Sequence, residues 1–135
     1  MKFIGLNDRQ LNLKNPKKYL INWGKPSRSI FQSRVKKYLH TFWKSDIVFE
    51  EFRLVGTRLS FDFYNANKKI IIEAQGAQHV KFVKFFHGNR LKFLEQLKRD
   101  QKKFDFCQKN SLTLLEIYPE DVLCLEFFEE KGIYL

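Results

Sequence analysis

Residues 59–79 read LSFDFYNANKKIIIEAQGAQH, and this stretch decides the fold that the sequence predicts. The alternation of apolar and polar residues in LSFDFY and the β-branched run III are typical of strands. The mainly polar residues NANK between them are typical of a turn. The stretch therefore predicts a β hairpin made of residues 59–64 and 69–74. Asp62 lies inside the first strand, and Glu73 directly follows the apolar run of the second.

The two acids of this hairpin raise a question of charge, because a buried carboxylate without a partner is costly. Pairing of the strands brings Asp62 and Glu73 together, and one proton or one divalent cation relieves their repulsion. Mg²⁺ takes oxygen ligands and keeps several waters, so two carboxylates and a backbone carbonyl can be enough protein to hold it. Alternatively, each acid faces solvent and pairs with one of the many lysines.

The segments on either side of the hairpin predict an α/β domain. The expected elements are a helix starting after Ser27 or Ser29, strands at 47–54, 59–64 and 69–74, a helix at 89–110, a strand at 111–118 and a helix opened by Pro119. Their order, α-β-β-β-α-β-α, predicts a mixed β-sheet flanked by helices. Residues 1–27 are expected to form an irregular basic arm with at most one helical turn, and residues 28–135 a single domain.

Helical spacing predicts which faces of the two longer helices are buried. The first helix would turn Ile30, Phe31, Val35, Tyr38, Leu39 and Phe42 toward a core, with its basic residues mostly on the other side. The second would bury one mainly apolar stripe made of Leu91, Leu94, Leu97, Gln101, Phe104 and Gln108.

Charge and composition narrow the class of protein. The net charge is +10, and residues 1–45 hold 11 Lys or Arg against one acid, whereas residues 111–135 hold one against six. This asymmetry predicts a polyanionic partner for one side of the molecule. No apolar run is long enough to span a membrane, so a cytoplasmic protein without a membrane partner is expected. Cys107 and Cys124 have apolar neighbours and no zinc-ligand spacing, which predicts buried free thiols.

The hairpin stretch, read together with QLKRDQKKFDFCQKNSLTLLEI at 96–117, resembles the PD-(D/E)XK nuclease superfamily. More narrowly, it resembles small phage-associated, very-short-patch-repair-like or homing-type endonucleases of that group. The resemblance covers about residues 28–118. It implies a restriction-endonuclease-like fold, a phage-encoded protein acting in the host cell, and an active site made of Asp62, Glu73 and Gln75. Gln75 replaces the usual lysine, and the acid of the lead helix is replaced by Gln32 or Ser33.

The resemblance implies a Mg²⁺-dependent DNA endonuclease, with Mn²⁺ able to substitute. One ion, with a second one left open, would be held by Asp62, Glu73 and the carbonyl of Ala74. Gln75 would position water, and His79 would shuttle a proton or contact the scissile phosphate, unless it is a structural histidine. DNA would be gripped by Arg28, Arg34, Lys36, Lys37, Lys81, Lys84, His87, Arg90 and Lys103.

Cutting a duplex takes two cuts, so a homodimer or larger homo-oligomer is expected. Three alternatives stay open at this point. The first is a catalytically inactive relative that binds nucleic acid, which the missing lysine and helix acid favour. The second is an RNA-directed nuclease or RNA-binding protein, because the charge pattern does not distinguish the two sugars. The third and weakest is a purely structural protein whose basic arm binds another protein.

Overall fold

The computed structural model describes residues 1–54, 56–75 and 90–135, with the side chains of Arg90 and Phe93 outside the described part. Its elements are β1 (Lys2–Ile4), β2 (Gln10–Asn12), the 3-10 helix η1 (Pro16–Tyr19), α1 (Ile30–Trp43), β3 (Val48–Arg53), β4 (Ser60–Asn65), β5 (Ile70–Ala74), α3 (Arg90–Lys109), β6 (Thr113–Ile117) and α4 (Leu125–Glu130). From α1 onward, the order of the described elements is the one that the sequence predicts.

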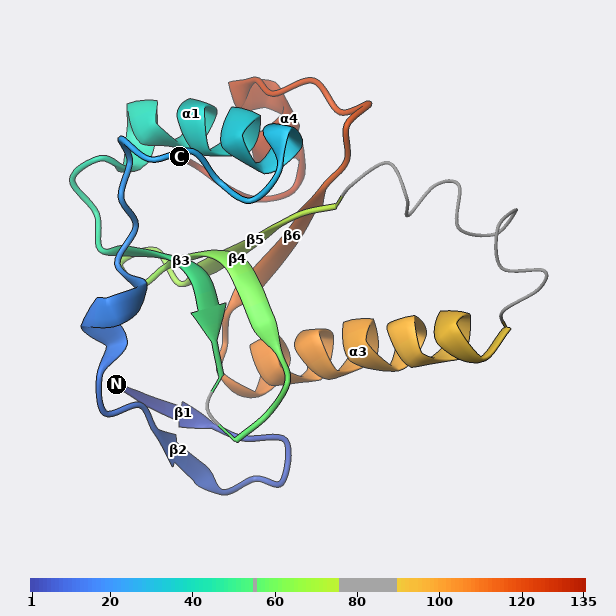
Figure 1. Cartoon of the computed structure of the whole chain (residues 1–135). Helices are drawn as coiled ribbons and strands as arrows, with labels where there is room; N and C mark the ends of the chain where they lie inside the picture. The colour runs from blue at the N-terminus through green and yellow to red at the C-terminus, as the bar shows by residue number, and fades with distance from the viewer. Residues whose placement is uncertain (55, 76–89) are drawn as a thin grey trace.

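A four-stranded mixed sheet with strand order β3-β4-β5-β6 forms the centre of the fold. The β3–β4 and β4–β5 pairs are antiparallel, whereas β5 and β6 are parallel. The predicted hairpin is confirmed, with Phe63 paired to Ile72 and Asn65 to Ile70. Helices α1 and α4 lie on one face of the sheet, and α3 and the β1–β2 hairpin lie on the other (Figure 1). The chain is therefore a mixed α/β protein with helices on both faces of the sheet.

Each face of the sheet carries its own hydrophobic core. On the α1 side, Val35, Leu39 and Trp43 pack with Phe63 and Ile72. The core on the other side joins the β1–β2 hairpin and α3 to the sheet, and it contains Phe3, Leu13, Phe52, Phe61, Phe106 and Cys107. Since the strands are covered on both faces, near-continuous apolar runs such as III in β5 are expected of them.

Helix α1 begins where the sequence predicts, because the Ser29 Oγ accepts a hydrogen bond of 3.0 Å from the backbone N–H of Gln32. The predicted faces are only partly right. Ile30 is 92% exposed, since it occupies the first turn beyond the edge of the core. Lys36, expected on the solvent side, is 4% exposed, and its Nζ lies 2.7 Å from Oε1 of Glu50.

The predicted apolar stripe of α3 is wrong. Leu91, Leu94 and Phe104 are 69%, 44% and 47% exposed, whereas Phe106 and Cys107 are buried. Figure 1 shows α3 extending past the edge of the sheet, so the strands do not cover its first turns. The face of α3 that turns toward the sheet carries Lys103 instead, which contacts Glu73 of β5.

The two ends of the chain also differ from expectation. In place of an irregular arm, residues 1–27 contain the β1–β2 hairpin and η1, and the hairpin places the buried Phe3 in the core. Pro119 lies in a turn rather than at the start of a helix, because Tyr118 and Asp121 hydrogen-bond each other there. The final helix begins at Leu125.

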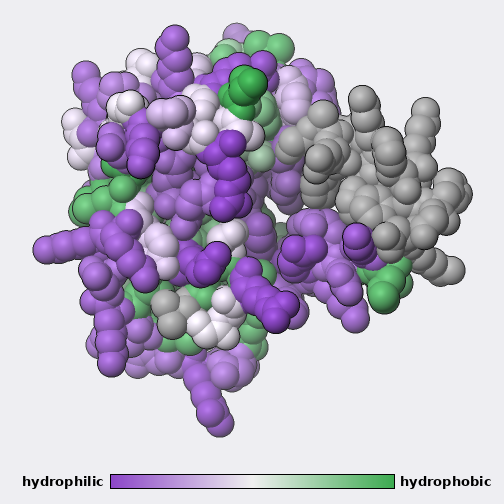
Figure 2. All heavy atoms as spheres, in the orientation of Figure 1, coloured by the Kyte–Doolittle hydropathy of each residue, from purple (hydrophilic) through white to green (hydrophobic). Residues whose placement is uncertain are grey.

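Both cysteines are free, as the sequence predicts. Cys107 is buried as expected, whereas Cys124 is only partly buried. In the described ranges, no helix combines the length and the apolar character that crossing a bilayer requires. Figure 2 shows mainly hydrophilic side chains over the face seen in Figure 1, with apolar residues in small separate patches.

Candidate functional site

Asp62 and Glu73 meet across the β4–β5 pair, as the sequence predicts. The backbone N–H of Asp62 donates a hydrogen bond to Oε2 of Glu73 over 3.2 Å. In return, Oδ2 of Asp62 accepts a hydrogen bond of 2.8 Å from the backbone N–H of Ala74. Each carboxylate is thus fixed by the other strand, and Glu73 is only 4% exposed.

The pKa of the Asp62 carboxyl is raised to about 8. Burial contributes most, followed by the charge of Glu73 and the hydrogen bond between the two side chains, while the charge of Glu51 adds a smaller effect. Two carboxylates this close repel each other when both are ionised. A proton on Asp62 relieves that repulsion, as a bound cation also would. A cation held between the two carboxylates would therefore compete with this proton.

Lys103 supplies a positive charge to this pair from α3. Its Nζ lies 2.5 Å from Oε1 of Glu73, and its side chain is 20% exposed against 5% for Glu73. The same ammonium lies 5.7 Å from the ring centroid of Phe61, a cation–π contact. An ammonium ion next to a buried carboxylate removes the cost of an unpaired charge, which explains the polar inward face of α3.

A second polar cluster lies next to the pair, between α1 and β3. Gln32 Nε2 donates to Oε2 of Glu50 and to Oε1 of Glu51, over 3.1 and 3.0 Å. Glu51 has a φ of 50°, a left-handed conformation that is unusual for a residue with a side chain. The pairs on either side of it, Glu50 with Phe63 and Phe52 with Phe61, place Glu51 opposite Asp62. Gln32, one of the two residues predicted to replace the helix acid of the resembled nucleases, thus holds an acid of β3.

The remaining predicted catalytic residues are placed unevenly. Gln75 follows β5 directly, and its backbone N–H bonds the carbonyl of Ile117 over 2.8 Å, so its position is tied to the sheet. His79 lies outside the described residues. Ala74, whose backbone carbonyl is the third predicted metal ligand, is the last residue of β5.

Among the residues predicted to bind nucleic acid, those that the structure describes do not form one surface. Arg28, Arg34 and Lys37 are exposed, but Arg34 and Lys37 belong to α1, on the opposite face of the sheet from α3 and Lys103. Lys36 is buried against Glu50 and cannot reach a phosphate in this fold. Lys81, Lys84 and His87 lie outside the described residues, as does the side chain of Arg90.

The donor set fits a hard divalent ion only in part. Two carboxylates and a nearby carbonyl are suitable oxygen ligands for Mg²⁺. Within residues 1–54, 56–75 and 90–135, however, no three His, Cys, Asp or Glu side chains are grouped so as to hold a metal ion. Any such ion would therefore take the rest of its ligands from water, substrate or backbone.

The sequence pointed to Asp62 and Glu73 but missed the pairing of Lys103 with Glu73. Asp100, three residues before Lys103 on α3, accepts a hydrogen bond from Nε2 of Gln96. The signal that could have found the contact is helical spacing: Lys103 comes three and four residues before the buried Phe106 and Cys107, so it lies on the same face of α3 as they do. Glu51 carried no signal in the sequence.

Comparisons with known proteins find three viral relatives. The chain is 41% identical over 59 residues to uncharacterized protein 307L of Invertebrate iridescent virus 6, covering 44% of the chain and 30% of that protein. It is 29% identical over 99 residues to uncharacterized protein 033L of Invertebrate iridescent virus 3, covering 70% of the chain and 51% of that protein. With uncharacterized protein 094L of Frog virus 3 (isolate Goorha) it shares 40% over 77 residues, covering 56% and 49%.

The chain therefore spans about half or less of the length of these relatives. No model of a protein family matches it, and no solved structure matches it. The names of these relatives state no activity, so any proposed function rests on the geometry of the site.

Proposed function

We propose that the chain is a virus-encoded, divalent-metal-dependent DNA endonuclease with a restriction-endonuclease-like arrangement of its α/β elements. The observation that carries the proposal is the mutual fixing of Asp62 and Glu73 by hydrogen bonds across β4 and β5. The order of elements, the two acids at the edge of the apolar sheet and the excess of basic residues all support it.

Asp62, Glu73 and the carbonyl of Ala74 would hold the ion. A bound divalent ion supplies a Lewis acid for the scissile phosphate and lowers the pKa of a coordinated water. Gln75 carries no charge and cannot act as a general base, so its part is to orient water by hydrogen bonds.

In this proposal, Lys103 carries the positive charge that Gln75 lacks. Its Nζ is in contact with Glu73, 2.5 Å away, and is close enough to the pair to neutralise negative charge that develops on a phosphate there. An ammonium group placed in advance costs no reorganisation during the reaction.

A second candidate function follows from the same contact. If Lys103 occupies the cation position permanently, the chain is a nucleic-acid-binding protein without hydrolytic activity. The ion pair with Glu73 and the glutamine at position 75 both favour this candidate.

The test is nicking of supercoiled plasmid DNA with Mg²⁺, Mn²⁺ or EDTA, beside an RNA substrate of matched length. We expect metal-dependent nicking of DNA that Asp62→Asn and Glu73→Gln each reduce at least 100-fold. Glu130→Gln, which changes an exposed acid of α4 on the face of the sheet opposite α3, is the matched control and should leave nicking unchanged.

The outcomes separate the candidates. Activity that survives both active-site changes would contradict the proposal, because the pair would then not be the site. Binding of DNA with no cleavage under any metal would favour the inactive candidate, and preferential cleavage of RNA would change the substrate class.

A further inference from the structure

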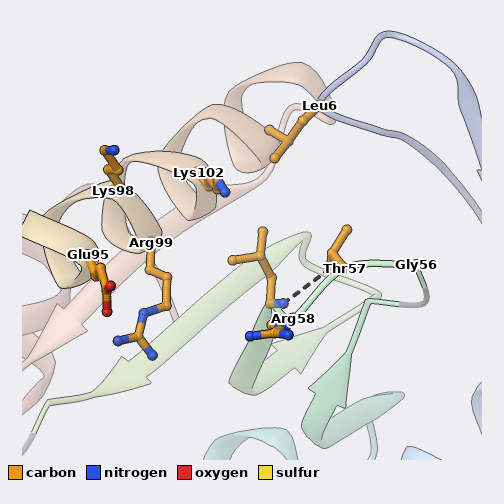
Figure 3. Close-up of a pocket in the computed structure, with 9 residues that line it drawn as sticks. Leu6, Gly56, Thr57, Arg58, Glu95, Lys98, Arg99 and Lys102 are labelled. Carbon is orange, nitrogen blue, oxygen red and sulfur yellow. Dashed lines mark hydrogen bonds between the residues drawn. The ribbon is translucent and has the colours of Figure 1, made fainter. Parts of the chain in front are cut away.

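A basic pocket lies between α3 and the turn that joins β3 to β4 (Figure 3). Its volume is about 570 Å³. Four cationic side chains line it, Arg58, Lys98, Arg99 and Lys102, together with the single acid Glu95. Figure 3 shows Arg99 pointing from α3 toward the strands, with Arg58 coming from the turn across the pocket, so positive charge comes from both walls.

These four cations have no anionic partner inside the part of the chain that the structure describes. The ion pairs found there use Lys36, Lys103 and Lys109 instead. Lys98 and Lys102 are four residues apart on one helix, a spacing at which like charges repel each other. Because the fold leaves this excess of charge uncompensated, the pocket favours an anion from solution.

The wall formed by the turn is fixed in place. Thr57 Oγ1 donates to the carbonyl of Leu54 over 2.8 Å and accepts from the backbone N–H of Leu59 over 3.1 Å. Gly56 takes a φ of 82°, which suits glycine. Arg58 is therefore presented from an ordered turn, which lowers the entropic cost of binding a ligand.

The pocket adjoins the Asp62–Glu73 pair along both of its walls. Arg99 is one helical turn before Lys103, a rise of about 6 Å. On the other wall, Leu59 is three residues before Asp62, about 10 Å along the strand. A chain of phosphates in contact with the pocket would therefore continue toward the two carboxylates.

We infer that this pocket holds the sugar–phosphate backbone of a DNA strand and leads it to the Asp62–Glu73 pair. The identity of the polyanion rests on the proposed function. Guanidinium groups such as those of Arg58 and Arg99 bind phosphate with two parallel hydrogen bonds, and the lysines add charge. Leu6, which is partly buried, provides apolar surface in the same pocket for the sugar or base.

The experiment is a fluorescence anisotropy titration of a labelled 20-nucleotide DNA, single-stranded in one arm and duplex in the other, with EDTA present. The pocket variant is Arg58→Gln with Arg99→Gln in the full chain. The matched control is Lys14→Gln with Lys44→Gln, which removes the same charge from exposed residues outside the pocket. Circular dichroism and thermal melting check that both double variants fold.

We expect the pocket variant to lose about 10- to 100-fold in affinity and to lower the slope of log K against log salt by about 2, one for each lost phosphate contact. The control should lose less than about threefold. A loss in either arm supports the inference, and the arm with the larger loss identifies the form of DNA. Equal affinities and slopes for wild type and pocket variant, or equal losses in the two double variants, would overturn it.

The inference and the proposed function can fail separately. If no metal supports cleavage but the pocket variant still loses binding, the nuclease proposal fails and the pocket stands. If nicking depends on Asp62 and Glu73 while the pocket variant binds and cleaves like wild type, the nuclease proposal stands and the pocket does not bind the strand.

Discussion

Lys103 Nζ lies 2.5 Å from Oε1 of Glu73, so the helix after the hairpin supplies the cation that a buried strand carboxylate needs. Glu73 also accepts a hydrogen bond from the backbone of Asp62, which belongs to a third element. Three segments of the chain thus converge on one carboxylate, and its partners determine both the stability of this region and its chemistry.

Removing the ammonium group should destabilise the fold. Lys103→Met leaves Glu73 buried without an ionic partner, which costs about 3 kcal/mol or more. Chemical denaturation should show a lower free energy of unfolding, and adding Glu73→Gln should restore most of it because no charge is then left unpaired. Equal losses in the single and double variants would contradict a direct pairing.

The raised pKa of Asp62 predicts a pH dependence of stability. Its carboxyl has an ordinary pKa of 3.8 and one of about 8 in the folded chain, so the folded state binds more protons between these values. The contribution of this group to stability is therefore fully present below about pH 4 and is lost as the pH rises toward 8.

Asp62→Asn resembles the protonated carboxyl and should remove this dependence. We expect the variant to be more stable than wild type at pH 8.5, by on the order of 2 kcal/mol, and similar to it at pH 4. Urea denaturation at a series of pH values measures the difference. Parallel curves for the two proteins would show that Asp62 does not titrate in this way.

Metal binding should compete with the same proton. Isothermal titration with Mg²⁺ or Mn²⁺ should show affinity that rises with pH up to about 8, because the ion requires the ionised Asp62. Asp62→Asn should abolish the binding and its pH dependence. Binding that is unaffected by pH or by this change would place the ion elsewhere.

The buried pair of Lys36 and Glu50 predicts a contrast between neighbouring lysines. Lys36→Gln should destabilise the chain by about 3 kcal/mol, because Glu50 then loses its ionic partner, whereas Lys37→Gln on the exposed face should change stability by less than about 0.5 kcal/mol. Thermal melting of both variants tests this. Comparable melting temperatures would argue against a buried ion pair at Lys36.

The two thiols should differ in reactivity. Burial is the main cause that raises the pKa of Cys107 to about 12, and the charge of Glu73 adds to it, so at pH 8 this side chain is a buried, protonated thiol. We expect a thiol reagent to label partly buried Cys124 first and Cys107 only after unfolding. Mass spectrometry of native and denatured samples distinguishes the two sites.

Strands β3 to β6, their order along the chain and the meeting of Asp62 with Glu73 were predictable from sequence, whereas strands β1 and β2 were not. A short turn joins β4 to β5, so pattern and turn chemistry together determine which residues face each other. The helix cap at Ser29 is equally local, because the Ser29 hydroxyl accepts a hydrogen bond from the backbone N–H of Gln32, three residues later.

The contacts that give the site its charge required the tertiary structure. Helical periodicity shows that α3 has an apolar stripe but not that Leu91 and Leu94 face outward, because burial depends on where the sheet ends. Lys103 lies 30 residues from Glu73, and Lys36 lies 14 from Glu50, so no local pattern pairs them. A buried carboxylate selects whichever cation the packed helices bring close, and only the assembled fold determines which one that is.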